Sequence, residues 1–283
     1  MSPLRKQMDE DMVVRGLAVR TRESYLEAVA ALAKYYGRRP DQIDEAQVQR
    51  YIVHLLQDRK LAWSSCNVAL QGLKFFYRVT LKRRSAEFYI PTPRQPQKLP
   101  QILSAEEVTR IIEHSVNPKH RMLLMTAYGT GVRLSELCHL KLTDIDSERM
   151  VVRVEQGKGA KDRYTLLSAR LLKELREYWA AFRPRPWLFT SSAGTGPLCE
   201  ATAQKIFYGA KRRAGITKQC GIHGLRHAFA THLLEAGVDL ATIQRLMGHG
   251  HISSTMRYLH LTRKHMAQTP SPLDLLRRPD PTP

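Results

Sequence analysis

The chain has 283 residues, of which 43% are hydrophobic, so it can form one large domain or two ordinary domains with cores of their own. Charged residues make up 25% of the sequence, a globular rather than a disordered proportion. The 45 Lys and Arg residues outnumber the 26 Asp and Glu residues, and the net charge of +19 favours nucleic acid as a partner. A merely basic surface and an affinity for anionic membranes are the alternatives, and charge does not separate DNA from RNA.

The four cysteines are widely spaced and form no metal-binding or disulfide pattern. The first ten residues are polar and charged, unlike a signal peptide. No stretch approaches the roughly 18–20 apolar residues that cross a bilayer. We therefore expect a reduced, soluble, cytoplasmic protein that does not bind a membrane.

The first ninety residues show the apolar spacing of helices, with hydrophobic residues three and four apart. Thr21 can cap a helix over residues 25–33, and Asp44 with Gln47 forms the capping-box pattern of a second helix. A third helix follows and leads into a basic cluster, which is a candidate DNA contact. The cluster consists of Lys82, Arg83 and Arg84.

The composition changes at residues 91–100, which contain four prolines and no periodicity. Proline fixes φ and removes a backbone donor, so this stretch is expected to be an extended linker. We expect four parts in chain order: a helical domain over 1–90, a linker over 91–103, a second domain over 104–268 and a tail over 269–283. Basic residues outnumber acidic ones on both sides of the linker, so both domains are expected to touch the polyanion.

The second domain is expected to be helical with one exception. Ser104 and Glu107 form a capping box, whereas β-branched residues at 151–154, a turn at 156–159 and a strand at 164–167 predict a hairpin. Further helical patterns cover residues 168–182, 200–213, 223–236, 239–247 and 254–266. The predicted fold is therefore mainly α, with a small antiparallel sheet in the C-terminal domain.

Several polar residues of this domain are weak signals when each is taken alone. His223 and Arg226 share a helix face but are common as surface residues, and Tyr258 alone is more often half-buried in a core. Arg133 can simply pair with Glu136 one turn later. Two further readings are equally ordinary: a solvated hairpin tip for Lys158, and a helix C-terminal contact for His249.

Taken together and in order, these residues are a strong signal. The blocks are Gly131-Val-Arg133-Leu-Ser-Glu136-Leu, Gly157-Lys158-Gly, His223-Gly-Leu-Arg226-His227, Leu246-Met-Gly-His249 and Tyr258. This pattern resembles the tyrosine recombinase (phage integrase) family, in particular its Xer-type members, and the resemblance covers nearly the whole chain. It implies a SAM-like core-binding domain over 1–90 and a catalytic domain over 104–268. The segment Gly250-His251-Ile252 is a minor departure from the family pattern.

The resemblance implies a role for each matching position. Arg133 and Arg226 would clamp the scissile phosphate, because guanidinium groups are permanently charged and bind phosphate in a bidentate manner. Tyr258 would attack to give a covalent 3′-phosphotyrosine, which conserves the bond energy, so rejoining needs no ATP. Three residues would assist: His249 as a hydrogen-bond donor, Lys158 as the acid for the leaving 5′-oxygen, and His223 as acid–base help for the tyrosine.

Three neighbours of these positions receive other interpretations. Glu136 is best read as orienting the arginine or a histidine, and Lys161 as meeting a phosphate while Lys158 is the acid. His227 is read as a packing residue. No carboxylate cluster suggests a two-metal nuclease, so we expect neither a metal nor any other cofactor.

Two alternatives to an active recombinase remain: a type IB topoisomerase-like enzyme, and a decayed relative that only binds DNA. The resemblance implies double-stranded recombination sites as substrate and four protomers on two sites, passing through a four-way junction and exchanging the tail 269–283. A second recombinase or an accessory protein is a further possible partner. The sequence does not choose between chromosome-dimer resolution and a mobile-element role, and the lack of an insertion after the hairpin disfavours an integron integrase.

Overall fold

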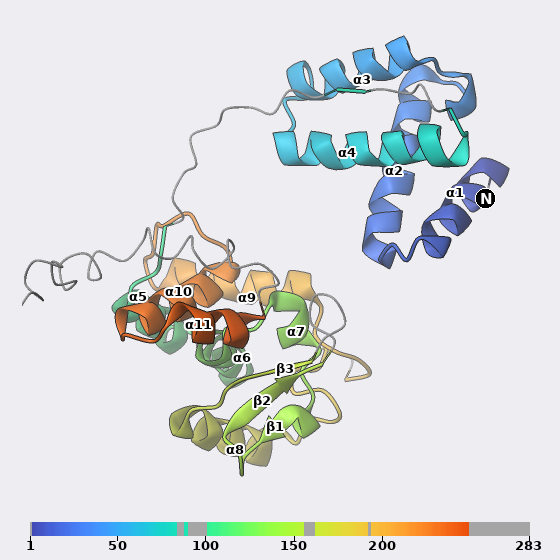
Figure 1. Ribbon diagram of the computed structural model, residues 1–283. Coiled ribbons are helices and arrows are strands. Elements are labelled where there is room, and N and C mark those ends of the chain that lie inside the picture. Colours follow the sequence, from blue (N-terminus) through green and yellow to red (C-terminus); the bar gives the residue numbers. More distant parts are fainter. Residues whose placement is uncertain (1, 84–87, 90–100, 156–161, 192–193, 249–283) are drawn as a thin grey trace, which may run out of the picture. The chain divides into compact units, whose positions relative to one another are not determined.

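The computed structural model describes residues 2–83, 88–89, 101–155, 162–191 and 194–248. The chain divides into two compact units, Met1–Gln97 and Lys98–Pro283, each of which has its own hydrophobic core (Figure 1). The fold is mainly α with one small antiparallel sheet, which confirms the predicted fold class. No helix in the described ranges has the length and apolar character that would span a membrane.

The first unit is a helical bundle. Its elements are α1 (Pro3–Val14), α2 (Val19–Tyr36), the 3₁₀ turn η1 (Pro40–Gln42), α3 (Glu45–Gln57), α4 (Trp63–Phe75) and the π-helical turn η2 (Phe76–Thr80). The capping box of Asp44 and Gln47 is confirmed at the start of α3. The predicted cap at Thr21 is wrong: Gly16, at φ 68°, turns the chain directly after α1, and α2 already begins at Val19.

The second unit contains the sheet and most of the remaining helices. In chain order these are α5 (Ala105–Glu113), α6 (Pro118–Thr130), α7 (Leu134–Cys138), the 3₁₀ turn η3 (Leu142–Asp144), β1 (Ile145–Asp146), β2 (Val151–Val154), β3 (Arg163–Leu166), α8 (Ala169–Phe182), α9 (Glu200–Arg213), α10 (His223–Glu235) and α11 (Leu240–Met247). The capping box of Ser104 and Glu107 is confirmed at α5. The two predicted strands pair antiparallel with Val152 opposite Thr165, and the turn predicted at 156–159 lies outside the described residues.

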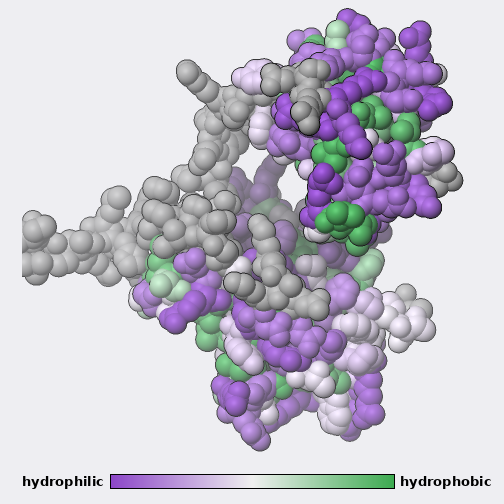
Figure 2. Space-filling view, turned by 45° about the vertical axis from the view of Figure 1, so that its right-hand side comes forward, coloured by the Kyte–Doolittle hydropathy of each residue, from purple (hydrophilic) through white to green (hydrophobic). Residues whose placement is uncertain are grey.

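Helix α6 is the centre of the second unit. It packs against α8 and α10 and also contacts α7, α9 and β3 (Figure 1). Its residues 122–127 are all buried, so this part of the helix is covered on every side. A helix that is covered on all sides fixes the position of the residues that follow it. On the face that Figure 2 shows, the surface of both units is largely hydrophilic.

Candidate active site

The site is built where α6 ends. Gly131 caps the helix in the left-handed conformation, at φ 61°, and a Cβ there would lie 2.3 Å from the Phe229 ring of α10. Only glycine combines this backbone conformation with this close approach. Thr165 of β3 donates a 2.7 Å hydrogen bond to the carbonyl oxygen of Thr130, so the sheet is fastened to the same turn.

Arg133 and Glu136 form an ion pair at the start of α7. Nη1 of Arg133 donates to Oε1 of Glu136 at 2.8 Å, and the backbone N–H of Arg133 donates to Oε2 at 2.7 Å. The carboxylate thus caps the helix and holds the guanidinium with the same group. The pairing that we considered from the sequence is present.

Arg226 reaches the same place from α10. Its residue is only 6% exposed, and its guanidinium donates to the carbonyl oxygens of Gly131 and, at 2.6 Å, of Met247. A buried guanidinium requires such partners, because an unpaired charge in a low-dielectric interior is costly. The guanidinium of Arg226 is therefore buried and held in place by these two carbonyls.

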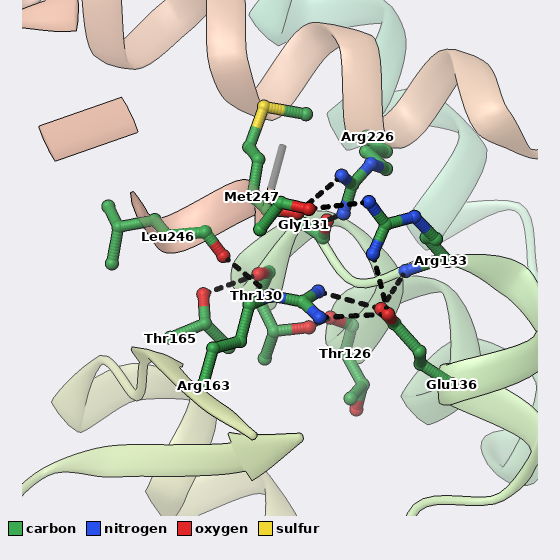
Figure 3. A network of polar contacts seen from close by, with 11 residues as sticks. Thr126, Thr130, Gly131, Arg133, Glu136, Arg163, Thr165, Arg226, Leu246 and Met247 are labelled. Carbon is green, nitrogen blue, oxygen red and sulfur yellow. Dashed lines mark hydrogen bonds and ion pairs between the residues drawn. The ribbon is translucent and has the colours of Figure 1, made fainter. Parts of the chain in front are cut away.

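The arginines converge on the C-terminal end of α11, as Figure 3 shows. Nη2 of Arg133 donates at 2.7 Å to the carbonyl of Gly248, next to the Met247 carbonyl that Arg226 holds. Gly248 is the left-handed C-cap of α11, at φ 60°. These last carbonyls carry the negative end of the helix dipole, which suits cationic partners. Two positive groups from separate helices are therefore fixed at the end of α11, next to the position in sequence of His249.

His223 is the first residue of α10, one turn before Arg226, and its side chain is exposed. Partial desolvation lowers the pKa of His223, and the positive charges of Arg226 and Arg133 lower it further. The imidazole is therefore held in its neutral form at pH 7, in which it can accept a proton.

The remaining predicted site residues divide into two groups. Lys82 is exposed, whereas Arg83 donates at 2.6 Å to the carbonyl of Asp41 and lies over the ring of Tyr77. Their role in DNA binding stays a prediction. The others lie outside the described residues: Arg84, Lys158, Lys161, His249 and Tyr258.

The sequence analysis missed one residue of this network, Arg163. It is the first residue of β3, and both of its terminal nitrogens donate to Glu136, at 2.8 and 2.7 Å. Strand alternation places Arg163 and Thr165 on one face, but the sequence does not show what that face contacts. The predicted strand began one residue too late to include it.

Among the described residues, no group of three or more His, Cys, Asp or Glu side chains is placed to hold a metal ion. The cluster is instead one carboxylate among three guanidinium groups. Such a site suits an anion with several oxygens, of which phosphate is an example.

The family model of the phage integrase family matches residues 101–265, which include this whole network. The chain belongs to this family of tyrosine recombinases. A second model, the N-terminal SAM-like domain of phage integrases, matches residues 4–87 of the recombinase.

Relatives of this recombinase cover most or all of its length. It is 45% identical over 285 residues to y4qK of Sinorhizobium fredii, a protein whose name places it among the integrases and recombinases; the match covers 100% of this chain and 92% of that one. It is 38% identical over 222 residues to the tyrosine recombinase XerA of Pyrococcus furiosus, with 75% of each chain covered.

Solved structures show the same fold. The crystal structure of XerA recombinase matches with a TM-score of 0.56 and 28% identity over 94% of this chain and 95% of that one. A lambda integrase tetramer bound to a Holliday junction matches with a TM-score of 0.71 and 18% identity over 90% and 76%.

Proposed function

We propose that this recombinase cuts and rejoins DNA at specific sites through a covalent 3′-phosphotyrosine on Tyr258, without ATP or a metal ion. The observation that carries this proposal is the convergence of Arg133 and Arg226 on the end of α11. The next residue along the chain is His249, and Tyr258 follows nine residues later. A clamp for phosphate therefore lies directly before the segment that carries the proposed nucleophile.

Each described group has a step in this mechanism. The two arginines bind the non-bridging oxygens, on which negative charge grows during attack, and they are fixed before the reaction begins. Neutral His223 takes the proton of the attacking tyrosine, whose hydroxyl is otherwise mostly protonated at pH 7. Lys158 protonates the leaving 5′-oxygen, His249 donates a further hydrogen bond, and Lys161 contacts a neighbouring phosphate.

We further propose that four protomers act on two double-stranded sites, pass through a four-way junction and exchange their tails. The similarity to the lambda integrase fold, solved as a tetramer on a Holliday junction, supports this assembly. The system served is a mobile element, an integrative system or a resolution system. A second recombinase or an accessory protein remains a possible partner.

The test begins with the DNA that the protein itself selects from a random-sequence duplex library. A nick beside the cleaved phosphate of this selected duplex lets the cut end diffuse away, so the covalent intermediate accumulates. Wild-type protein should form a DNA adduct that survives denaturing electrophoresis. Tyr258→Phe should bind the duplex equally well and form none, because only the attacking hydroxyl is lost.

The matched control is Tyr208→Phe, since Tyr208 is 52% exposed on α9, outside the network. This variant should form the adduct as the wild type does. An adduct with Tyr258→Phe would show that another residue attacks. If the wild type forms no adduct, the protein is a decayed relative that only binds DNA. Relaxation of supercoils without strand exchange would favour the topoisomerase-like alternative.

A further inference from the structure

Arg163 is a buried charge at the junction of three elements. Its side chain is only 9% exposed, and it extends from β3 toward α7 and α11 (Figure 3). An arginine so placed requires partners for its donors. Its terminal nitrogens bind both oxygens of Glu136, and Nε donates at 3.1 Å to the carbonyl of Leu246 in α11.

The Glu136 carboxylate is shared between two guanidinium groups. Oε1 accepts from Nη1 of both Arg133 and Arg163, each at 2.8 Å, and Oε2 accepts from the Arg133 backbone N–H and from Nη2 of Arg163, each at 2.7 Å. One negative charge thus faces two positive charges. With Arg133 alone, the Glu136 carboxylate would offset the charge of its partner. Arg163 adds a second guanidinium to this carboxylate, so the three groups together carry a net positive charge beside Arg226, which favours an anionic ligand.

The same guanidinium completes a row of three at the end of α11. The carbonyls of Leu246, Met247 and Gly248 accept from Arg163, Arg226 and Arg133, in that order. The contact with Arg163 is close, because a Cβ on Gly248 would lie 2.5 Å from Cδ of Arg163. Arg163 therefore fixes the backbone directly before His249.

We propose that Arg163 is a positioning residue of the active site, which sets the Arg133–Glu136 pair and the end of α11 for phosphate binding. This role rests on the function proposed above. Arg163 follows Lys158 by five residues and Lys161 by two in the sequence. A single side chain thereby links the Arg133–Glu136 pair to the backbone at the end of α11.

The experiment measures adduct formation on the nicked selected duplex in a single turnover, together with duplex affinity and the thermal unfolding midpoint. Arg163→Met removes the charge, and Arg163→Lys keeps the charge but loses the fork that binds both oxygens of Glu136. Both should bind the duplex nearly as well as the wild type and cleave about 10²-fold more slowly, the loss typical of a small misplacement of reacting groups.

A double variant separates positioning from folding. In Arg163→Met, Arg133 is the only guanidinium left to pair with Glu136. Adding Glu136→Gln should therefore raise the cleavage rate about tenfold above that of Arg163→Met. Arg153→Met is the control, because Arg153 lies on the adjacent strand β2, where it pairs with the buried carboxylate of Asp144 and with Glu155 at the surface, away from Glu136. It removes an arginine and its ion pairs from the same sheet and should cleave at the wild-type rate.

Three results would overturn the proposal: wild-type cleavage by Arg163→Lys, a cleavage loss that only follows the loss of folded protein, or independent effects of Glu136→Gln and Arg163→Met. If Arg163→Met does not fold, Arg163→Lys alone decides. If the wild type forms no adduct, the proposed function fails and this role fails with it. If the wild type forms the adduct and the Arg163 variants form it at the same rate, the proposed function stands and this role is wrong.

Discussion

Arg133 and Gly248 are 115 residues apart in the sequence, and Nη2 of Arg133 donates a 2.7 Å hydrogen bond to the Gly248 carbonyl oxygen. The bond joins the start of α7 to the residue before His249. It means that this guanidinium is already oriented without DNA. Preorganised donors of this kind need little rearrangement when charge develops on a bound phosphate.

Replacement of Gly248 by alanine should therefore cost more stability than an ordinary left-handed glycine would. Gly237, at φ 89° with open space around it, is the matched control, and Gly237→Ala should cost about 1–2 kcal/mol from backbone strain alone. Gly248→Ala adds the clash with Cδ of Arg163, a further loss of about 1–3 kcal/mol. Urea unfolding measures both variants. Equal losses would show that Arg163 moves aside at little cost.

Glu136 should make the stability depend on pH in the acid range. Burial alone would raise its pKa, but hydrogen bonds and charge from Arg163, with a smaller effect of Arg133, lower the pKa from 4.5 to about 2. Because the folded pKa is depressed, the stabilisation is complete above pH 4.5 and is lost as the pH falls toward 2. The wild type should therefore exceed Glu136→Gln in free energy of unfolding by about 2 kcal/mol less at pH ~3 than at pH ~5.5.

Denaturant unfolding at several pH values measures this gap. The control is Glu155→Gln, whose carboxylate pairs with Lys141 and Arg153 at the surface, where solvent weakens the pair. The difference in free energy of unfolding between Glu155→Gln and the wild type should change much less over the same pH range. A Glu136→Gln gap that stays constant would mean that Glu136 is not held ionised by the two arginines.

Local signals predicted much of this fold. Capping boxes at Asp44 and Ser104 and the strand pair around Thr165 depend on neighbouring residues, and the structure contains them. Helix α7, at five residues, is too short to show a helical period, and its start depends on Glu136 reaching back to Arg133.

The site was predictable only where its residue types are distinctive. Arg133 and Arg226 stand in recognisable blocks, but their partners at Gly131, Met247 and Gly248 are backbone carbonyls, which every residue has. Only the packing of α6, α10 and α11 decides which carbonyls they meet. Arg163 contacts Glu136 because β3 turns one face toward α7, a tertiary relationship that no local pattern contains.

Lys158 should act on the leaving group rather than on binding. Lys158→Ala should slow cleavage of the selected duplex by roughly 10²–10⁴-fold, the usual contribution of a general acid. A duplex with sulfur at the 5′-bridging position has a better leaving group and should largely escape this loss. Single-turnover rates on both duplexes make the comparison, with Lys161→Ala as the neighbouring control. Equal losses on both would assign Lys158 to phosphate binding and make Lys161 the candidate acid.

Cleavage should not depend on divalent metal. Adduct formation should continue in EDTA, because arginines neutralise the phosphate, while binding should weaken steeply with added salt as lysines and arginines displace counterions from the duplex. The measurement compares adduct yield with and without EDTA at one fixed ionic strength. A loss in EDTA that magnesium restores would contradict the proposed mechanism.

The tail should link protomers rather than bind DNA. After Pro270 the sequence Ser271-Pro272-Leu273-Asp274-Leu275-Leu276 has the start signal of a short helix, since proline is tolerated in a first turn. So short a helix is not stable alone in water, and its leucines need an apolar surface, which we propose belongs to a neighbouring protomer.

Deletion of residues 269–283 should leave binding to one site unchanged, weaken cooperative filling of paired sites and disturb the order of strand cleavage. Because the deletion also removes Arg277 and Arg278, the control replaces these two arginines with alanine and keeps the leucines. A gel-shift titration on a two-site duplex measures cooperativity. Unchanged cooperativity in the truncated protein, or an equal loss in the arginine control, would contradict docking through the leucines.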